Sequence, residues 1–138
     1  MTAADGEGAS KLLEVTVKGA LTWEDAAGLS KSVISSNLVK AAIFGSDANW
    51  GRILCAMGYS GVDFDPDKVD LFIESANGSL KLVEDGISSD FSEEKATDIL
   101  TADEVKVLVD LKQGAAFATA WGCDLTYDYV KINADYRS

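Results

Sequence analysis

The stretch VKVLVDLKQGAAFATAWGC (residues 105–123) decides how this chain folds. Its first half places valine at every second position before Leu111, which is the period typical of a half-buried strand. Gln113-Gly114 then predicts a turn into a second strand, from Ala115 to Cys123. Alanine occupies four positions of this second strand, so we expect another backbone layer or another chain to pack closely on it.

The same two-residue period predicts further strands earlier in the chain, at residues 13–17 and 69–73. Asn77-Gly78 after the second of these is typical of a type I′ hairpin turn, because both residues tolerate a positive φ. The return strand of this hairpin is expected at residues 80–82.

Helical periodicity between the strands predicts four helices, after Thr22, at residues 38–43, at residues 50–57 and after Ser92. For the third helix, Ser46 or Asp47 is the expected N-cap and Gly58 the expected left-handed C-cap. The resulting order of elements indicates an α+β fold with a mostly antiparallel or mixed sheet of about five strands and helices on one face. No internal repeat or linker divides residues 1–138, so we expect a single two-layer domain.

The composition of the chain excludes some classes of binding partner. The net charge of −11 disfavours nucleic acid and anionic membranes, whose phosphates require a basic surface. No window of about 18 apolar residues predicts a membrane span, and the first ten residues lack the pattern of a signal peptide. We therefore expect a soluble, cytoplasmic protein.

The chain contains no histidine, so it cannot supply a Ser-His-Asp or Cys-His catalytic pair by itself. It also lacks the commonest zinc ligand. Cys55 and Cys123 have no metal-binding spacing, and we interpret both as reduced, small core residues.

One acidic motif has a spacing similar to that of a calcium-binding loop. Asp63, Asp65 and Asp67 occupy loop positions 1, 3 and 5, and Glu74 occupies position 12, as in an EF-hand. However, Lys68 stands where the sharp turn of that loop requires glycine. We therefore favour a solvated acidic turn before a strand, and expect no metal.

Three short motifs allow both a functional and a structural interpretation. Thr2 could act as a nucleophile with its own amine as base, but no strand follows to hold it, so we favour a simple chain start. Glu7, flanked by glycines, suits the ammonium group of an amino acid, although spacing alone favours an exposed turn. Residues 46–52 could form a polar site at a helix N-terminus, or a helix cap with an ion pair of Arg52.

Three longer segments resemble the C-terminal region of the bifunctional ornithine acetyltransferases: GEGASK (6–11), SNLVKAAIFGSDANWGRILCAMGYSG (36–61) and AWGCDLTYDYVKINADYRS (120–138). Their order and spacing match across essentially the whole chain. The resemblance implies a role in arginine biosynthesis, in which the family transfers an acetyl group from N-acetylornithine to L-glutamate. Many members also use acetyl-CoA as a donor, and no cofactor is implied.

The resemblance also implies residue roles. Glu7 matches the acid that holds the amino group of the substrate, and Asn133 matches the amide that binds near its α-carboxylate. Ser138 matches a terminal hydroxyl that also contacts the substrate. Ser10 and Ser138 replace commoner threonines but keep the hydroxyl, and Ala41 replaces a threonine with an expected effect on packing only.

The catalytic group is expected outside this chain. The family precursor cleaves itself before a threonine, which then carries the acetyl group, and an oxyanion hole in the α chain stabilises the intermediate. That nucleophile lies upstream of the matching region, so this chain resembles the C-terminal part of the β chain and is expected to be inactive alone. Its implied partners are the α chain and the upstream β-chain region, in a heterotetramer of two α and two β chains. The alternative is a non-catalytic amino-acid-binding or assembly module.

Overall fold

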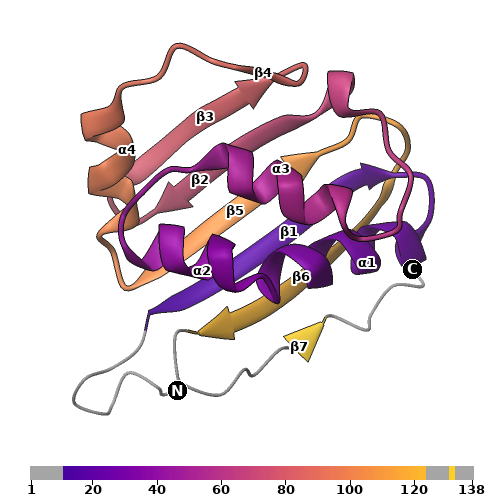
Figure 1. Cartoon of the computed structure of the whole chain (residues 1–138), viewed down its shortest axis with the longest axis horizontal. Coiled ribbons are helices and arrows are strands. Elements are labelled where there is room, and N and C mark those ends of the chain that lie inside the picture. The colour runs from indigo at the N-terminus through magenta and orange to yellow at the C-terminus, as the bar shows by residue number, and fades with distance from the viewer. Residues whose placement is uncertain (1–10, 124–130, 133–138) are drawn as a thin grey trace.

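The computed structural model describes residues 11–123 and 131–132, which form one sheet with helices packed on it (Figure 1). The strands are β1 (Leu12–Ala20), β2 (Asp70–Ser75), β3 (Gly78–Glu84), β4 (Ile87–Ser88), β5 (Glu104–Asp110), β6 (Ala116–Cys123) and β7 (Lys131–Ile132). The helices are α1 (Trp23–Ile34), α2 (Asn37–Phe44), α3 (Trp50–Gly58), α4 (Glu93–Leu100) and the 3₁₀ helix η2 (Pro66–Lys68). No helix in this described part is long and apolar enough to cross a membrane.

The sheet is mixed, with the strand order β4-β3-β2-β5-β1-β6-β7. β1 is parallel to β5 and antiparallel to β6, and β2 is antiparallel to both β3 and β5. This confirms the expected α+β class with a mixed sheet. The two strands beyond the expected five are β4 and β7, each of two residues, which are too short to show any periodicity.

The helices cover one face of the sheet, as Figure 1 shows for α1, α2 and α3. Val15 lies opposite Val107 and Ala120 in the sheet, and all three are at most 1% exposed beneath the helices. α4 packs on β2 and β3, and its apolar residues belong to the same buried cluster. One continuous core therefore holds both layers together.

The alanines of β6 lie beneath α1, which packs against β1 and β6. Ala118 and Ala120 are fully buried, and their small side chains leave room for a helix backbone to approach the sheet. The expected close backbone layer on β6 is confirmed, and α1 of the same chain provides it.

Helix caps agree in part with the prediction. Thr22 caps α1 by accepting a hydrogen bond from the backbone N–H of Asp25, at 3.1 Å. For α3, however, the prediction of Ser46 or Asp47 is wrong, because the cap is Asn49. Ser46 has a φ of 61°, and this left-handed residue ends the preceding turn instead of starting the next helix.

Gly58 is not a left-handed C-cap, contrary to the prediction. It is the last residue of α3, and the cap is Tyr59 in a right-handed conformation with a φ of −87°. The left-handed glycine lies slightly later, at Gly61 with a φ of 82°.

The hairpin between β2 and β3 is confirmed, but its turn is not of type I′. Ser75 pairs with Gly78, so Ala76 and Asn77 form the turn, and neither has a positive φ. The Asn77 side chain donates a hydrogen bond to the Asp98 carbonyl in α4, at 2.8 Å. This long-range contact is invisible in the local sequence.

Candidate functional site

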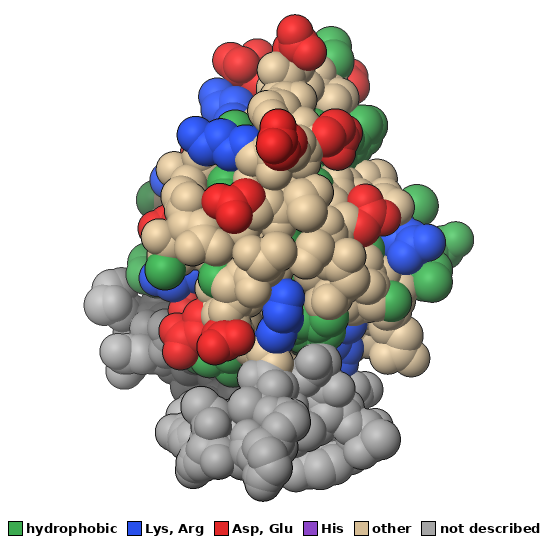
Figure 2. All heavy atoms as spheres, turned by 90° about the vertical axis from the view of Figure 1, so that its left-hand side faces the viewer, with side chains coloured by type: hydrophobic (Ala, Val, Ile, Leu, Met, Phe, Trp, Pro, Cys, Tyr) green, Lys and Arg blue, Asp and Glu red, His purple; other side chains and the backbone are tan. Residues whose placement is uncertain are grey.

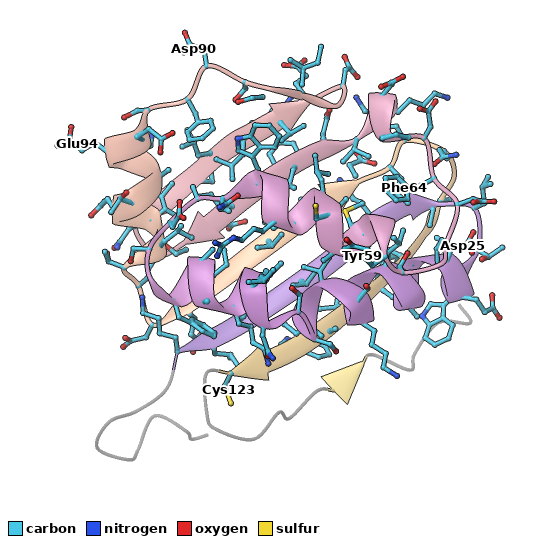
Figure 3. The ribbon with its side chains drawn as sticks, viewed as in Figure 1. Asp25, Tyr59, Phe64, Asp90, Glu94 and Cys123 are labelled. Carbon is cyan, nitrogen blue, oxygen red and sulfur yellow. The ribbon has the colours of Figure 1, made fainter. Side chains whose placement is uncertain are left out.

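One end of the sheet gathers the start of β1 and β5 and the end of β2 and β6. The described chain enters β1 through Lys11 at this end and leaves β6 at Cys123, which Figure 3 labels. The segment before Lys11 therefore meets the domain at this end, whereas Ile132 pairs with Ala120 within β6 and β7 runs away from this end. We call this region the β1-start end.

At the β1-start end, the last carbonyls of α4 accept hydrogen bonds from three side chains. Lys11 Nζ donates to the Leu100 carbonyl at 2.8 Å. Ser75 Oγ and Asn77 Nδ2, from the β2–β3 hairpin, donate to the two preceding carbonyls at 2.6 and 2.8 Å. Because terminal helix carbonyls lack intrahelical partners, these three side chains satisfy the end of α4 and fasten it to the sheet.

A hollow of about 540 Å³ lies beside these contacts. It is lined by Glu74, Ser75, Ala76, Ala102, Asp103, Glu104 and Lys106. Its three carboxylates outnumber its one ammonium group, so its charge favours cationic groups such as the ammonium of an amino acid. Figure 2 views this side of the molecule and shows acidic side chains spread over it, with basic ones between them.

The sheet face away from the helices is polar and aromatic. Trp121 Nε1 donates to Glu14 Oε1 at 3.1 Å, and the hydroxyls of Thr16 and Thr119 lie 2.8 Å apart. Both contacts join β1 to β6, and the adjacent Phe117 is 55% exposed. These pairs fix the register of the two strands on this face.

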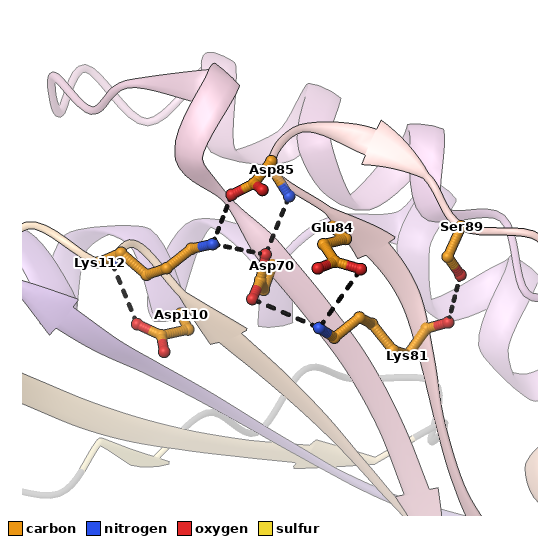
Figure 4. Close-up of polar contacts among 7 residues, drawn as sticks. All are labelled: Asp70, Lys81, Glu84, Asp85, Ser89, Asp110 and Lys112. Atoms are coloured by element: carbon orange, nitrogen blue, oxygen red, sulfur yellow. Dashed lines mark hydrogen bonds and ion pairs between the residues drawn. The ribbon is translucent and has the colours of Figure 1, made fainter.

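A second polar cluster lies at the opposite end of the sheet (Figure 4). Lys112 Nζ is 2.9 Å from Asp70 Oδ1 and 2.6 Å from Asp85 Oδ1. Asp70 Oδ1 also accepts a hydrogen bond from the Asp85 backbone N–H at 2.9 Å, and Lys81 Nζ lies 3.8 Å from Asp70 Oδ2. This ionic cluster ties the start of β2 to the β3–β4 turn and to the loop after β5.

The charges of this cluster stabilise one another. Burial raises the pKa of Asp70, but the Asp85 N–H, Lys112 and Lys81 outweigh it and hold the pKa below its usual value. Hydrogen bonds to Asp85 and Asp70 raise the pKa of Lys112 above its ordinary value. Each of these side chains has a partner in the cluster, which therefore joins three segments of the fold.

The predicted substrate-binding residues Glu7, Asn133 and Ser138 lie outside the described residues, as does Thr2. The acidic turn is described: the Asp65 side chain caps η2 by accepting from the Asp67 N–H at 3.0 Å. Glu74 belongs to strand β2, in agreement with the structural interpretation. Within residues 11–123 and 131–132, no group of three or more His, Cys, Asp or Glu side chains could hold a metal ion.

Residues 46–52 form a helix cap. Asn49 Oδ1 accepts from the Arg52 N–H at 3.2 Å, and the Arg52 guanidinium donates to the Leu38 carbonyl at 3.3 Å. In the described part of the chain, Arg52 therefore joins α3 to α2 through a carbonyl and not through the expected ion pair.

The two cysteines differ in how far their side chains are buried. Cys123 is buried as expected, but the prediction for Cys55 is wrong, because its side chain is exposed. The buried face of α3 consists of Ile53, Ala56 and Met57, which leaves Cys55 on the outer side of the helix.

Sequence reasoning missed the contact of Lys11 with the end of α4. Its acceptor, the Leu100 carbonyl, lies 89 residues away in the chain. A contact between a side chain and a distant backbone carbonyl leaves no motif in a single sequence.

Comparisons with known proteins agree on one family. The family model described as the ArgJ family matches residues 1–138. The "Arginine biosynthesis bifunctional protein ArgJ" of Caldanaerobacter subterraneus subsp. tengcongensis is 55% identical over 138 residues, covering 100% of this chain and 34% of that protein. The "Glutamate N-acetyltransferase" of Methanocaldococcus jannaschii is 51% identical over 142 residues, covering 100% of this chain and 35% of that protein.

A solved structure supports the same relationship. The crystal structure of the arginine biosynthesis bifunctional protein argJ from Bacillus halodurans matches with a TM-score of 0.79 and 48% sequence identity. The match covers 92% of this chain and 58% of that chain. Our chain spans about a third of the length of the curated relatives that it matches.

Proposed function

Because this chain belongs to the ArgJ family, we propose that it is the substrate-binding part of an acetyltransferase that moves an acetyl group from N-acetylornithine to L-glutamate. The observation that carries the proposal is the match over the whole chain to relatives named for arginine biosynthesis and for glutamate N-acetyltransferase. Acetyl-CoA is a second candidate donor. The proposal includes a cytoplasmic location.

We assign substrate binding to Glu7, Asn133 and Ser138. A zwitterionic amino acid requires an anion for its ammonium group and neutral donors for its carboxylate, and these three residues provide them. Among the described residues, Lys11 precedes β1 and Ile132 ends β7. Only β6 lies between β1 and β7, so the two strands are about 10 Å apart, and Ile132 is level with Val15 in the sheet.

We assign the chemical step to groups that the matched region lacks. A threonine upstream of this region takes the acetyl group, its own amine acts as the base, and an oxyanion hole in the α chain stabilises the intermediate. In this division of labour, residues 1–138 form one domain of the β chain that binds and orients the substrate. The complete assembly is then a heterotetramer of two α and two β chains, produced by self-cleavage.

Complementation tests this function. The 138-residue chain would be purified alone and after co-expression with the upstream region of a close relative, and transfer from N-acetylornithine to isotope-labelled glutamate would be measured. We expect no transfer by the chain alone and measurable transfer by the combination. Transfer by the isolated chain would refute the division of labour.

A negative result from the combination would favour the alternative, a non-catalytic amino-acid-binding or assembly module. Calorimetry separates these two roles, because an amino-acid-binding module binds glutamate without converting it. An assembly module binds the upstream region but not glutamate.

A further inference from the structure

We infer that Asn77 is a site of spontaneous deamidation, and that its conversion to a carboxylate loosens the attachment of the β2–β3 hairpin to the end of α4. This inference is independent of the proposed function. Asn77 is exposed in the hairpin turn, and together with Gly78 it forms the only Asn-Gly pair in the sequence. Asparagine is among the residues that limit the chemical durability of proteins.

The reaction requires only water as a co-reactant. The backbone nitrogen of Gly78 attacks Cγ of Asn77, and a new C–N bond closes a succinimide ring. The side-chain amide leaves as ammonia, which takes up the proton of the Gly78 N–H. Water then opens the ring and leaves either aspartate or isoaspartate at position 77.

The fold itself places glycine next to Asn77. Gly78 has a φ of 138°, a conformation that residues with a side chain rarely adopt, and it pairs with Ser75 to close the turn. Because Gly78 has no side chain, its nitrogen is open to approach by Cγ of Asn77. The turn therefore requires the neighbour that makes Asn77 most reactive.

The atom that leaves in this reaction is the one that binds α4. Asn77 Nδ2 donates to the Asp98 carbonyl at 2.8 Å and to Thr101 Oγ1 at 3.3 Å. Thr101 Oγ1 in turn donates to the Asp98 carbonyl at 2.7 Å. These bonds hold the Asn77 amide in one orientation, so the reaction is slower in the folded chain than in the unfolded chain.

The product does not suit the position of the amide. A carboxylate has no proton to donate to the Asp98 carbonyl, and its negative charge lies at the C-terminal end of α4, where the helix dipole is also negative. The adjacent hollow already has three carboxylates and one ammonium group. Isoaspartate also lengthens the main chain by a methylene group, which disturbs the pairing of Ser75 with Gly78. Both products therefore weaken the contact between the hairpin and α4.

The first test incubates the purified 138-residue chain at mildly alkaline pH and follows the tryptic peptides of residues 32–40 and 69–81 by mass spectrometry. We expect Asn77 to convert to aspartate and isoaspartate, and to convert faster when urea unfolds the chain. Asn37 is also exposed but precedes Leu38, whose side chain hinders the attack, so it should stay an amide. Persistence of the amide at Asn77 in the folded chain, or equal conversion of Asn37, would overturn the inference.

Two variants test whether the contacts with α4 protect the amide. Thr101→Val removes the acceptor Oγ1 and should speed the conversion of Asn77 about twofold to tenfold, as expected for one lost hydrogen bond. Ser92→Ala removes the cap at the other end of α4, where the Ser92 side chain accepts from the Lys95 N–H, and should leave the rate unchanged. An equal effect of the two variants would contradict protection by the contact of Asn77.

A third measurement tests the consequence for the fold. Asn77→Asp reproduces one product, whereas Asn77→Ala removes the donor without adding a charge. We expect Asn77→Asp to lower the Tm by about 3–6 °C, and by more than Asn77→Ala, because only the carboxylate repels the carbonyls at the end of α4. Hydrogen exchange in Asn77→Asp should become faster in α4 and stay unchanged in α1. A Tm of Asn77→Asp equal to that of the unaltered chain would show that the conversion does not loosen α4.

Discussion

Asp70 keeps its charge at a position where only 8% of its surface is exposed, and it contributes stability only while it is ionised. Its pKa is lowered in the folded state, since the Asp85 N–H and Lys112 outweigh the effect of burial. A carboxyl group with a lowered folded pKa stabilises the protein above the pKa of the unfolded chain, and this contribution is lost as the pH falls through the folded pKa. The ionic cluster therefore weakens in acid.

We expect Asp70→Asn to lower the free energy of unfolding at pH 7 by about 1.5–3 kcal/mol, because charged hydrogen bonds are lost. The difference from the unaltered chain should shrink as the pH falls below about 4, where the Asp70 carboxyl of the unfolded chain becomes protonated, and should be lost as the pH falls through the lowered pKa of folded Asp70. Urea unfolding at a series of pH values measures both effects. Asp90→Asn, at an exposed position before α4, is the control and should stay within about 0.5 kcal/mol. A difference that persists undiminished at pH 2 would contradict this account.

Glu7 carries the most specific prediction for binding at the residue scale. In the longer, active protein, Glu7→Ala should raise KM about 10- to 100-fold, because an unpaired ammonium group loses about 1.5–3 kcal/mol of interaction. Steady-state kinetics with N-acetylornithine and glutamate provide the measurement. Glu24→Ala, in the exposed first turn of α1, should leave KM unchanged. An unaltered KM in Glu7→Ala would refute the assigned role.

At the scale of elements, Gly58, the last residue of α3, and Gly61, which follows the helix, allow a direct check of where the helix ends. Gly58 is helical, and a Cβ added there would meet nothing within 4 Å. We expect Gly58→Ala to be neutral or to stabilise the chain by up to about 1 kcal/mol. Gly61 has a φ of 82°, so Gly61→Ala should cost about 1–2 kcal/mol despite the open space around it.

Chemical denaturation of the two variants measures these changes. If Gly58 were the left-handed C-cap, as its position at the end of the apolar stripe suggests, the two results would be reversed. The stabilities of the Gly58→Ala and Gly61→Ala variants therefore decide between the C-cap predicted from sequence and the C-cap described in the structure.

Most helices and strands could be predicted because the apolar residues of each long element recur with a clear period. The valines of β5 and the apolar stripe of α3 depend only on which residues face the core, and both were found. The predictions that failed concern local backbone details, which contacts with residues distant in the sequence determine. Ser46 has the right chemistry for a cap but a left-handed backbone, and Asn77 is drawn to α4 instead of into a type I′ turn.

At the scale of the whole molecule, the family could be recognised from the sequence, whereas the contacts that organise the β1-start end could not. Glu7, Asn133 and Ser138 were proposed from matching motifs and remain predictions. Lys11 is the last residue of one of the same motifs, yet only the folded chain reveals its acceptor at Leu100. Motifs therefore identify shared residues more readily than the contacts of a side chain with a distant backbone carbonyl.

The pairing of β1 has a consequence for how the chain acquires its structure during translation. β1 leaves the ribosome before the other strands that the structure describes, but its neighbours β5 and β6 both belong to the final third of residues 1–138. The β2–β3 hairpin can close as soon as it is made, since its two strands are adjacent in the chain, whereas β1 must wait until β5 and β6 have been made. Its valine-rich side therefore stays unpaired longer than the hairpin strands and needs protection from aggregation in the nascent chain.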